Sequence, residues 1–267
     1  MLRNLKDLLG YTLHATDGTI GDLKDLYFDD QSWVVRYLIV DTGTWLSSRK
    51  VLVSPIAIAG SSATGKVFRS SLTREQVKNS PDIDTDTPVS RQHELRHLDY
   101  YGHPKYWEGV GLAGGIYPSW LTGLHNRGNA VEDPWSQPDR ARRTDEANQD
   151  TNAHLHLRSC NAVLQYQVHA SDGEIGHVED MLVDEETWAV RYIVVNTSSW
   201  WFGHKVLIAP QWIQNVSWPD RTVTVDLVRQ AVKLAPPYDS SVPLDPELEL
   251  RIFEHYGREL VDAAAKV

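Results

Sequence analysis

The stretch HATDGTIGDLKDLYFDDQSWVVRYLIVDTGTW, at residues 14–45, returns in closely similar form as HASDGEIGHVEDMLVDEETWAVRYIVVNTSSW at residues 169–200. The two copies align without a gap at an offset of 155 residues, which carries His14 onto His169. The same offset holds outward from this stretch, over residues 3–102 and 158–257. The repeated unit is longer than the roughly 20–50 residues of a solenoid repeat, so it predicts two domains of one fold.

The repeat divides the chain into three parts. We expect a first unit with a helical extension at residues 1–102, and a second such unit at residues 158–267. Residues 103–157 lie between them and change in character. They begin as an arm rich in Gly, Trp and Tyr and continue as a polar segment with prolines, which is typical of a linker.

Each unit has the pattern of a mainly β domain. Asp17-Gly18, between two apolar segments, predicts a tight hairpin turn. The stretch WVVRYLIVDT, from Trp33, is rich in β-branched and aromatic residues and predicts a central strand. KVLVSP, from Lys50, predicts a short strand that its proline ends. Several short strands at this spacing indicate a small barrel or a strongly bent sheet.

Two short helices are expected to end each unit. In the first unit Thr73 can cap a helix that ends before Pro81, and a second helix ends at Gly102. In the second unit Asp245 can cap a helix that has Pro246 in its first turn.

The order of these residues resembles the PRC-barrel family. That family includes the cytoplasmic part of the photosynthetic reaction centre H subunit and the C-terminal part of the ribosome-maturation factor RimM. The matching residues are the following, with their partners 155 positions later: Asp17, Gly18, Ile20, Gly21, Trp33, Val35, Arg36, Tyr37, Lys50, Val51, Leu52 and Pro55.

The resemblance implies two tandem, small, antiparallel β-barrels, each with a C-terminal helical extension. It also implies a non-catalytic role, since the relatives act as scaffolds and as adaptors between proteins or between protein and RNA. The H subunit has an N-terminal transmembrane helix that this sequence lacks, so the resemblance concerns the barrel domain rather than a place in a reaction centre.

The charge of the chain bears on its partners. Asp and Glu number 36 against 26 Lys and Arg, a net charge of -10, which argues against nucleic acid and anionic lipid. The single cysteine, Cys160, excludes an intramolecular disulfide, and the start MLRNLKDLLG lacks the apolar core of a signal peptide. We therefore expect a cytoplasmic protein without direct membrane insertion or cofactor, which binds another protein and can form a homo-oligomer.

The segment HELRH at residues 93–97 is the strongest indication of an enzyme. On a helix it places His93 and His97 on one face, where they could bind zinc, with Glu94 as general base and His103 as third ligand. The second repeat keeps the glutamate, but the three histidine positions hold Leu248, Ile252 and Arg258. Because the glutamate persists without the histidines, we expect no catalytic residue and no metal site, and a zinc-dependent hydrolase is the alternative.

Ten tryptophans are many for 267 residues. We expect most of them to fill small cores and the contact between the units. Trp45 and Trp200 occupy matching loops, and together with Trp201 they are candidates for a binding surface. Arg36 and Arg191, which interrupt apolar strands, are further candidates unless they face solvent or pair with a neighbouring carboxylate. A small-ligand or RNA-binding module is the third hypothesis, and a pocket lined by repeated tryptophans would favour its ligand-binding form.

Overall fold

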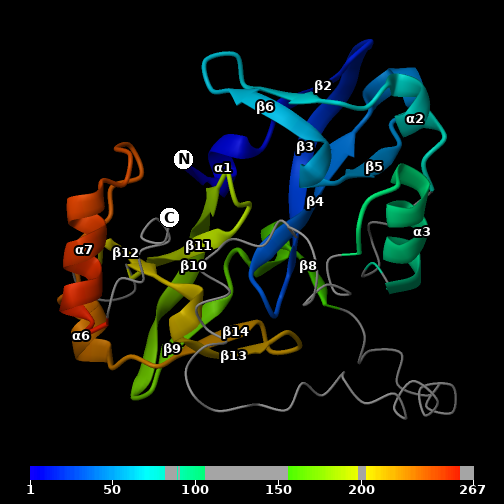
Figure 1. Cartoon of the computed structure of the whole chain (residues 1–267). Coiled ribbons are helices and arrows are strands. Elements are labelled where there is room, and N and C mark those ends of the chain that lie inside the picture. The colour runs from blue at the N-terminus through cyan, green and yellow to red at the C-terminus, as the bar shows by residue number, and fades with distance from the viewer. Residues whose placement is uncertain (82–88, 90, 106–155, 198–202, 259–267) are drawn as a thin grey trace, which may run out of the picture.

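The computed structural model describes residues 1–81, 89, 91–105, 156–197 and 203–258, and two seven-stranded β-sheets dominate it (Figure 1). The first sheet has the strand order β5-β4-β3-β2-β7-β6, with β8 paired to β3. Its strands are β2 (Thr12–Ala15), β3 (Gly18–Asp29), β4 (Val34–Asp41), β5 (Lys50–Val53), β6 (Ile58–Ser62), β7 (Val67–Ser70) and β8 (Leu157–Ser159).

The second sheet repeats this arrangement, in the order β12-β11-β10-β9-β14-β13, with β1 paired to β10. Its strands are β1 (Leu2–Asn4), β9 (Gln167–Ala170), β10 (Gly173–Asp184), β11 (Val190–Asn196), β12 (Lys205–Ile208), β13 (Ile213–Ser217) and β14 (Thr222–Val225). Corresponding strands of the two sheets start 155 residues apart, except that β11 begins one residue later than β4 predicts.

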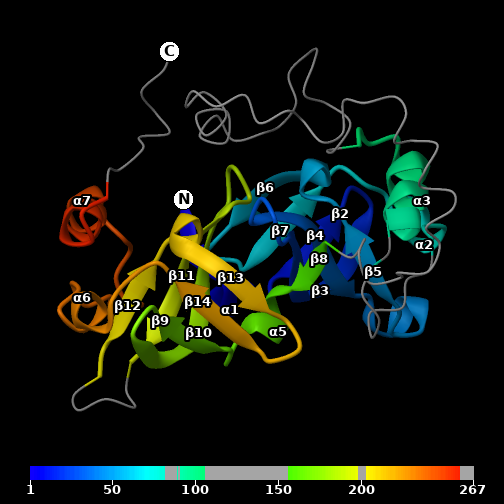
Figure 2. The same ribbon diagram turned by 90° about the horizontal axis from the view of Figure 1, so that it is seen from below.

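The helices flank the sheets and follow the same offset. They are α1 (Leu5–Leu8), α2 (Arg74–Lys78), α3 (Arg91–Tyr101), α5 (Cys160–Val163), α6 (Arg229–Lys233) and α7 (Pro246–His255), with 3₁₀ turns η1 (Gly43–Leu46), η2 (Pro55–Ala57) and η3 (Pro210–Trp212). The pairs α2–α3 and α6–α7 lie at opposite ends of the molecule, with the sheets between them (Figures 1 and 2). No helix in the described part of the chain is long and apolar enough to span a bilayer.

The two sheets exchange their first strands. β1 precedes the strands of the first sheet in sequence, yet it pairs antiparallel with β10 of the second sheet, where Leu2 lies opposite Asp184. In the reciprocal exchange β8 pairs antiparallel with β3, where Leu157 lies opposite Asp29. The short helices that follow also cross over, because α1 packs on β10 and α5 packs on β3. Each sheet therefore contains one strand from the other repeat.

A carboxylate fixes each exchanged segment, half-buried at Asp25 and buried at Asp180. Asp25 of β3 accepts hydrogen bonds from the Ser159 hydroxyl (2.5 Å) and from the Asn161 backbone N–H (3.1 Å). In the second sheet Asp180 accepts a hydrogen bond from the backbone N–H of Lys6 (3.3 Å). Burial raises the pKa of both carboxyl groups. The strand exchange thus has a polar anchor as well as a backbone ladder on each side.

The two repeats also meet along their β-hairpins and share a core. Val34 of β4 forms an isolated antiparallel bridge with Ala189, the residue before β11. Buried side chains of both repeats belong to a single apolar cluster, in which the rings of Phe68 and Trp188 lie 5.7 Å apart. Because apolar burial is the main source of stability, this shared cluster makes the two sheets stabilise each other.

The mainly β fold with short helices in two similar parts is confirmed, and its two sheets are not closed barrels. Neither sheet closes, since β5 and β6 stand at opposite ends of the strand order and no pairing joins them in the described residues. Each sheet also contains one parallel pair, β2 with β7 and β9 with β14. A physical reason lies at Pro55, which follows the short strand β5 and lacks the N–H that a continued ladder needs.

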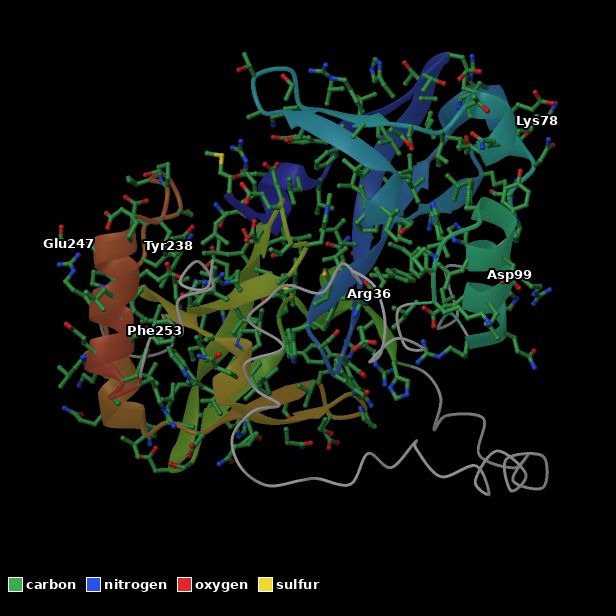
Figure 3. The ribbon with its side chains drawn as sticks, in the orientation of Figure 1. Arg36, Lys78, Asp99, Tyr238, Glu247 and Phe253 are labelled. Carbon is green, nitrogen blue, oxygen red and sulfur yellow. The ribbon has the colours of Figure 1, made fainter. Side chains whose placement is uncertain are left out.

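Several local signals of the sequence are confirmed. Thr73 caps α2 through a capping box with Gln76, and Asp245 caps α7 by accepting a hydrogen bond from the Leu248 N–H (2.7 Å). The predicted hairpin is present, but its two turn residues are Thr16 and Asp17, and Gly18 begins β3 at φ +148°. α7 packs on its sheet through Phe253, whose ring lies 5.1 Å from that of Trp212, while Glu247 lies on the outer side (Figure 3).

Candidate binding site between the two sheets

The histidines of HELRH lie on α3 and at its C-terminal end. His97 is buried, and its Nε2 is 2.9 Å from the carbonyl oxygen of Leu52 in β5. A carbonyl oxygen only accepts, so Nε2 carries the proton and has no lone pair for a metal. Burial lowers the pKa of His97 to about 4, which keeps the ring neutral. In the described part of the chain no three His, Cys, Asp or Glu side chains are grouped so as to hold a metal ion.

The glutamate that both repeats share connects a helix to a sheet. In the second repeat Glu249 of α7 accepts hydrogen bonds from Arg191 Nη2 (3.1 Å) and from the Tyr192 hydroxyl, both on β11. In the first repeat Glu94 is buried and forms an ion pair with Arg91 (3.2 Å). The interpretation that Arg191 pairs with a neighbouring carboxylate is therefore confirmed, and the glutamate has a structural role in each copy.

The other predicted binding residues are also engaged within the fold. The indole N–H of Trp45 donates to the Ile20 carbonyl (2.5 Å), and the Arg74 guanidinium lies 4.2 Å above its ring. Arg36 donates to the hydroxyl of Ser32 (3.2 Å). Trp200 and Trp201 lie outside the described residues. Their role as a binding surface, like that of Trp45, Arg36 and Arg191, stays a prediction.

A cavity of about 400 Å³ opens between the two sheets. One wall is the turn between β3 and β4, at residues 30–33, and the other is η3 with the edge strand β13. The β13–β14 hairpin lies beneath the end of the β3–β4 hairpin in Figure 1. We call this cavity the inter-sheet pocket; its lining residues are Asp30, Gln31, Ser32, Trp33, Pro210, Gln211, Ile213, Gln214, Asn215, Val216 and Trp218.

The lining of the inter-sheet pocket is apolar or neutral apart from one acid. Asp30 forms an ion pair with Arg158 Nε (2.8 Å) and lies 3.6 Å from His156 Nδ1. The guanidinium of Arg158 also stacks on the ring of Trp218, 4.3 Å from its centroid. Arg158 therefore neutralises the acid and also contacts a tryptophan that lines the pocket.

The inter-sheet pocket offers groups for binding rather than for chemistry. Its lining among the described residues includes no Lys, Arg, His or Cys, so it has no cation for a phosphate and no imidazole or thiol for catalysis. The hydroxyl of Ser32 donates to Asp29 Oδ1 (3.0 Å) and accepts from Arg36, so both of its bonds hold it within the turn. The amides of Gln211, Gln214 and Asn215 can both donate and accept hydrogen bonds.

The equivalent surface of the other repeat differs. At the positions of Gln211, Gln214, Asn215 and Trp218, the first repeat has Ile56, Ala59, Gly60 and Ala63. There Glu185 also spans the gap, since its Oε2 accepts a hydrogen bond from the hydroxyl of Ser61 in β6 (3.4 Å). Val216 takes the place of Ser61 on β13 and cannot form this link. Among the described residues, the two corresponding surfaces therefore carry different side chains and different contacts across the molecule.

Sequence reasoning did not find the inter-sheet pocket. Its two walls are about 180 residues apart in sequence, and they meet because of the strand exchange, which three-residue strands do not reveal by periodicity. A signal was nevertheless available. Within the otherwise similar repeat, the second copy replaces three small or apolar residues, at positions 56, 59 and 60, by amides.

Comparison with known proteins agrees with this fold. The model of the PRC-barrel domain matches residues 160–232. An uncharacterised protein of Deinococcus radiodurans is 34% identical over 85 residues, which cover 32% of this chain and 30% of that protein. The chain thus spans under a third of the length of this relative. The matched segment runs from α5 to α6 and includes most of the second sheet. Residues 160–232 are therefore similar to the PRC-barrel domain, in agreement with the resemblance of the sequence.

Proposed function

We propose that this chain is a non-catalytic binding or assembly module that holds another protein at its inter-sheet pocket. The observation that carries the proposal is the chemistry of the pocket lining. Neutral amides surround apolar side chains there, while the one acid is neutralised by Arg158. A lining of this kind recognises the polar backbone and apolar side chains of a polypeptide.

The arrangement of the two repeats around the pocket supports the same proposal. We propose that the chain is a tandem duplication whose units occupy residues 1–102 and 158–267, joined by residues 103–157. The exchanged strands β1 and β8 connect these units reciprocally, so the two walls of the pocket belong to one packed body. A partner therefore meets a preformed surface, which lowers the entropic cost of binding. We further propose a cytoplasmic location and a protein partner, with self-association as one form of assembly.

A small-molecule ligand is the second candidate. The cavity volume of about 400 Å³ falls within the range of roughly 300–1,000 Å³ of known ligand pockets. Trp33 and Trp218 would provide the apolar contacts of such a ligand. The net charge of -10 makes RNA the weaker form of this candidate.

Two variants test the proposed function. The pocket variant carries Gln211→Ile, Gln214→Ala and Asn215→Gly, which are the residues of the first repeat. The mirror variant carries the opposite changes, Ile56→Gln, Ala59→Gln and Gly60→Asn. All six residues are exposed, so both variants are expected to fold.

The wild-type chain and both variants would be used to isolate interacting proteins, followed by calorimetry with each purified partner. We expect a stoichiometric protein partner that binds the wild-type chain and the mirror variant, and binds the pocket variant about tenfold or more weakly. Equal binding to all three chains would contradict the pocket as the binding site. A small molecule that co-purifies with the wild-type chain but not with the pocket variant would favour the second candidate.

A further inference from the structure

The inter-sheet pocket follows the edge of β13 rather than one of its faces. Its lining includes the four consecutive residues 213–216. Successive side chains of a strand point to opposite faces of the sheet, so a cavity that touches all four must lie beside the strand. One side of β13 is occupied by β14, with Val216 opposite Val223. The cavity therefore lies along the other edge.

This other edge of β13 has backbone groups to offer. β13 ends the strand order of the second sheet, and within the described residues it pairs with β14 alone. A register shift between Ile213 and Asn215 marks a bulge at Gln214, which leaves residues 215–217 as the regular part of the strand. An added strand would therefore be short, and long edge-to-edge association is disfavoured.

The opposite wall of the inter-sheet pocket does not compete for these backbone groups. In the turn at residues 30–33, Asp29 Oδ1 accepts the backbone N–H groups of Gln31 (3.1 Å) and Ser32 (2.8 Å). The Trp33 N–H donates to the Asp29 carbonyl (2.8 Å). Because its donors are used internally, this wall is a rigid boundary, and it leaves a gap beside β13 for an extended segment.

The first repeat provides an internal comparison. Its edge strand β6 corresponds to β13, but there Glu185 crosses from the β10–β11 turn and accepts a hydrogen bond from Ser61. Glu185 also lies 3.5 Å from Arg3 Nε. A side-chain link therefore occupies the position in which the second repeat has its pocket. The difference indicates that one edge is bridged and the other is open to a ligand.

We propose that the ligand of the inter-sheet pocket is an extended polypeptide segment that adds as a strand to the outer edge of β13. This inference rests on the proposed function and specifies its ligand. The backbone of the segment pairs with residues 215–217. Alternate side chains of the segment face Trp33 and Trp218 on one side and the amides of Gln214 and Asn215 on the other. The part of the segment inside the pocket is uncharged. The one charged residue of the lining, Asp30, is already paired with Arg158, so no charge of the lining is left for a charged side chain or a phosphate.

The test uses linear peptides selected from a random library displayed on phage, with the immobilised full chain as target. Selected peptides are synthesised, and each backbone nitrogen is methylated in turn. Strand addition predicts an alternating pattern, since only every second N–H of an edge partner points to β13. We expect methylation at those positions to weaken binding by about tenfold or more, and methylation between them to change it by less than about threefold.

The protein side of the test uses the pocket variant and the mirror variant defined above. We expect the peptides to bind the mirror variant as they bind the wild-type chain, and the pocket variant about tenfold more weakly. Peptides that bind all three chains equally, or that show no alternation on methylation, would overturn strand addition at β13 while leaving a protein-binding function in place. Failure to select any peptide would also overturn strand addition, whereas the proposed function fails only if no protein partner is isolated with the wild-type chain.

Discussion

The backbone N–H of Val35 donates to the carbonyl oxygen of Trp188 over 2.8 Å. The reciprocal bond, from the N–H of Val190 to the carbonyl of Trp33, has the same length. Both tryptophans have positive φ, 54° for Trp33 and 57° for Trp188, which turns their carbonyls toward the other repeat. The two hairpins are therefore joined by a pair of main-chain bonds related by pseudo-twofold symmetry, in addition to the exchanged strands.

A first prediction concerns cleavage between the repeats. A specific protease site introduced within residues 126–152 allows the purified chain to be cut into two fragments. We expect the fragments to remain associated, because β1 completes the second sheet and β8 completes the first. Size-exclusion chromatography should show one peak at the mass of the intact chain, while denaturing electrophoresis shows two bands. Separation of the fragments without denaturant would contradict a stabilising role for the strand exchange.

A second prediction concerns the anchor of the exchange. Burial raises the pKa of Asp25 above its usual value of 3.8, so the native state binds this proton more tightly than the unfolded state. The resulting stabilisation is complete below the unfolded pKa and is lost as the pH rises through the folded pKa. We expect the wild-type chain to lose stability relative to Asp25→Asn as the pH rises from about 4, as measured by urea unfolding. If the free energies of unfolding of the two proteins changed with pH in parallel, the pKa of Asp25 would not be the cause. Asp180→Asn is the corresponding variant in the second repeat.

A third prediction has the opposite sign and concerns His97. Burial lowers its pKa from 6.5 to about 4, so the unfolded state binds the proton more tightly between these values. Stability is therefore retained above pH 6.5 and falls as the pH drops toward 4. We expect the wild-type chain to lose about 3 kcal/mol more than His97→Ile over this range. His93→Leu is the control on the same helix, and an equal loss in wild type and His97→Ile would show that His97 is not responsible.

A fourth prediction separates the module from a metalloenzyme. The proton on His97 Nε2 is held by the Leu52 carbonyl, so we expect elemental analysis to find no stoichiometric zinc in the purified chain. The double variant His93→Leu, His97→Ile, which carries the residues of the second repeat, should give the same result. One zinc per chain in the wild type, lost in this variant, would instead support the hydrolase alternative.

A fifth prediction concerns a glycine that both repeats keep. A Cβ on Gly21 would lie 1.9 Å from the Asp41 carbonyl oxygen, and one on Gly176 would lie 2.0 Å from that of Asn196. Only glycine allows β3 and β4 to approach so closely. We expect Gly21→Ala to lower the free energy of unfolding by about 2–4 kcal/mol. Gly60→Ala, with no atom within 4 Å of its Cβ, is the control, and similar unfolding curves for both variants would contradict the steric argument.

The local elements could be predicted from the sequence because their signals are local. The strand from Trp33, the cap at Thr73 and the cap at Asp245 all depend on neighbouring residues, and all are present. The comparison of the repeats also indicated a structural role for the shared glutamate, while the burial of His97 against β5 was not foreseen. Glu249, the shared glutamate of the second repeat, bonds to Arg191 and Tyr192.

The exchange and the pocket could not be predicted in the same way. β1 and β8 have three residues each, too few for a periodic pattern, and their partners are chosen by packing of the whole molecule. Asp25 and Asp180 each follow a charged residue in the sequence, as solvent-facing groups often do, yet both bond to segments of the other repeat. The barrel was inferred from the resemblance, whereas in each described sheet the two end strands, such as β5 and β6, do not pair.

The exchanged strands also determine the order in which the chain can mature on the ribosome. The first sheet awaits β8, which is synthesised at residues 157–159, and the strand β1 awaits β10, which is complete only at residue 184. The nascent first repeat therefore presents an unfilled position beside β3 until residues 157–159 have emerged, and an unattached N-terminal segment until residue 184 has emerged. A chain that stops early, or a translational pause before residue 157, leaves this position open to the β1 or β8 segment of another nascent copy.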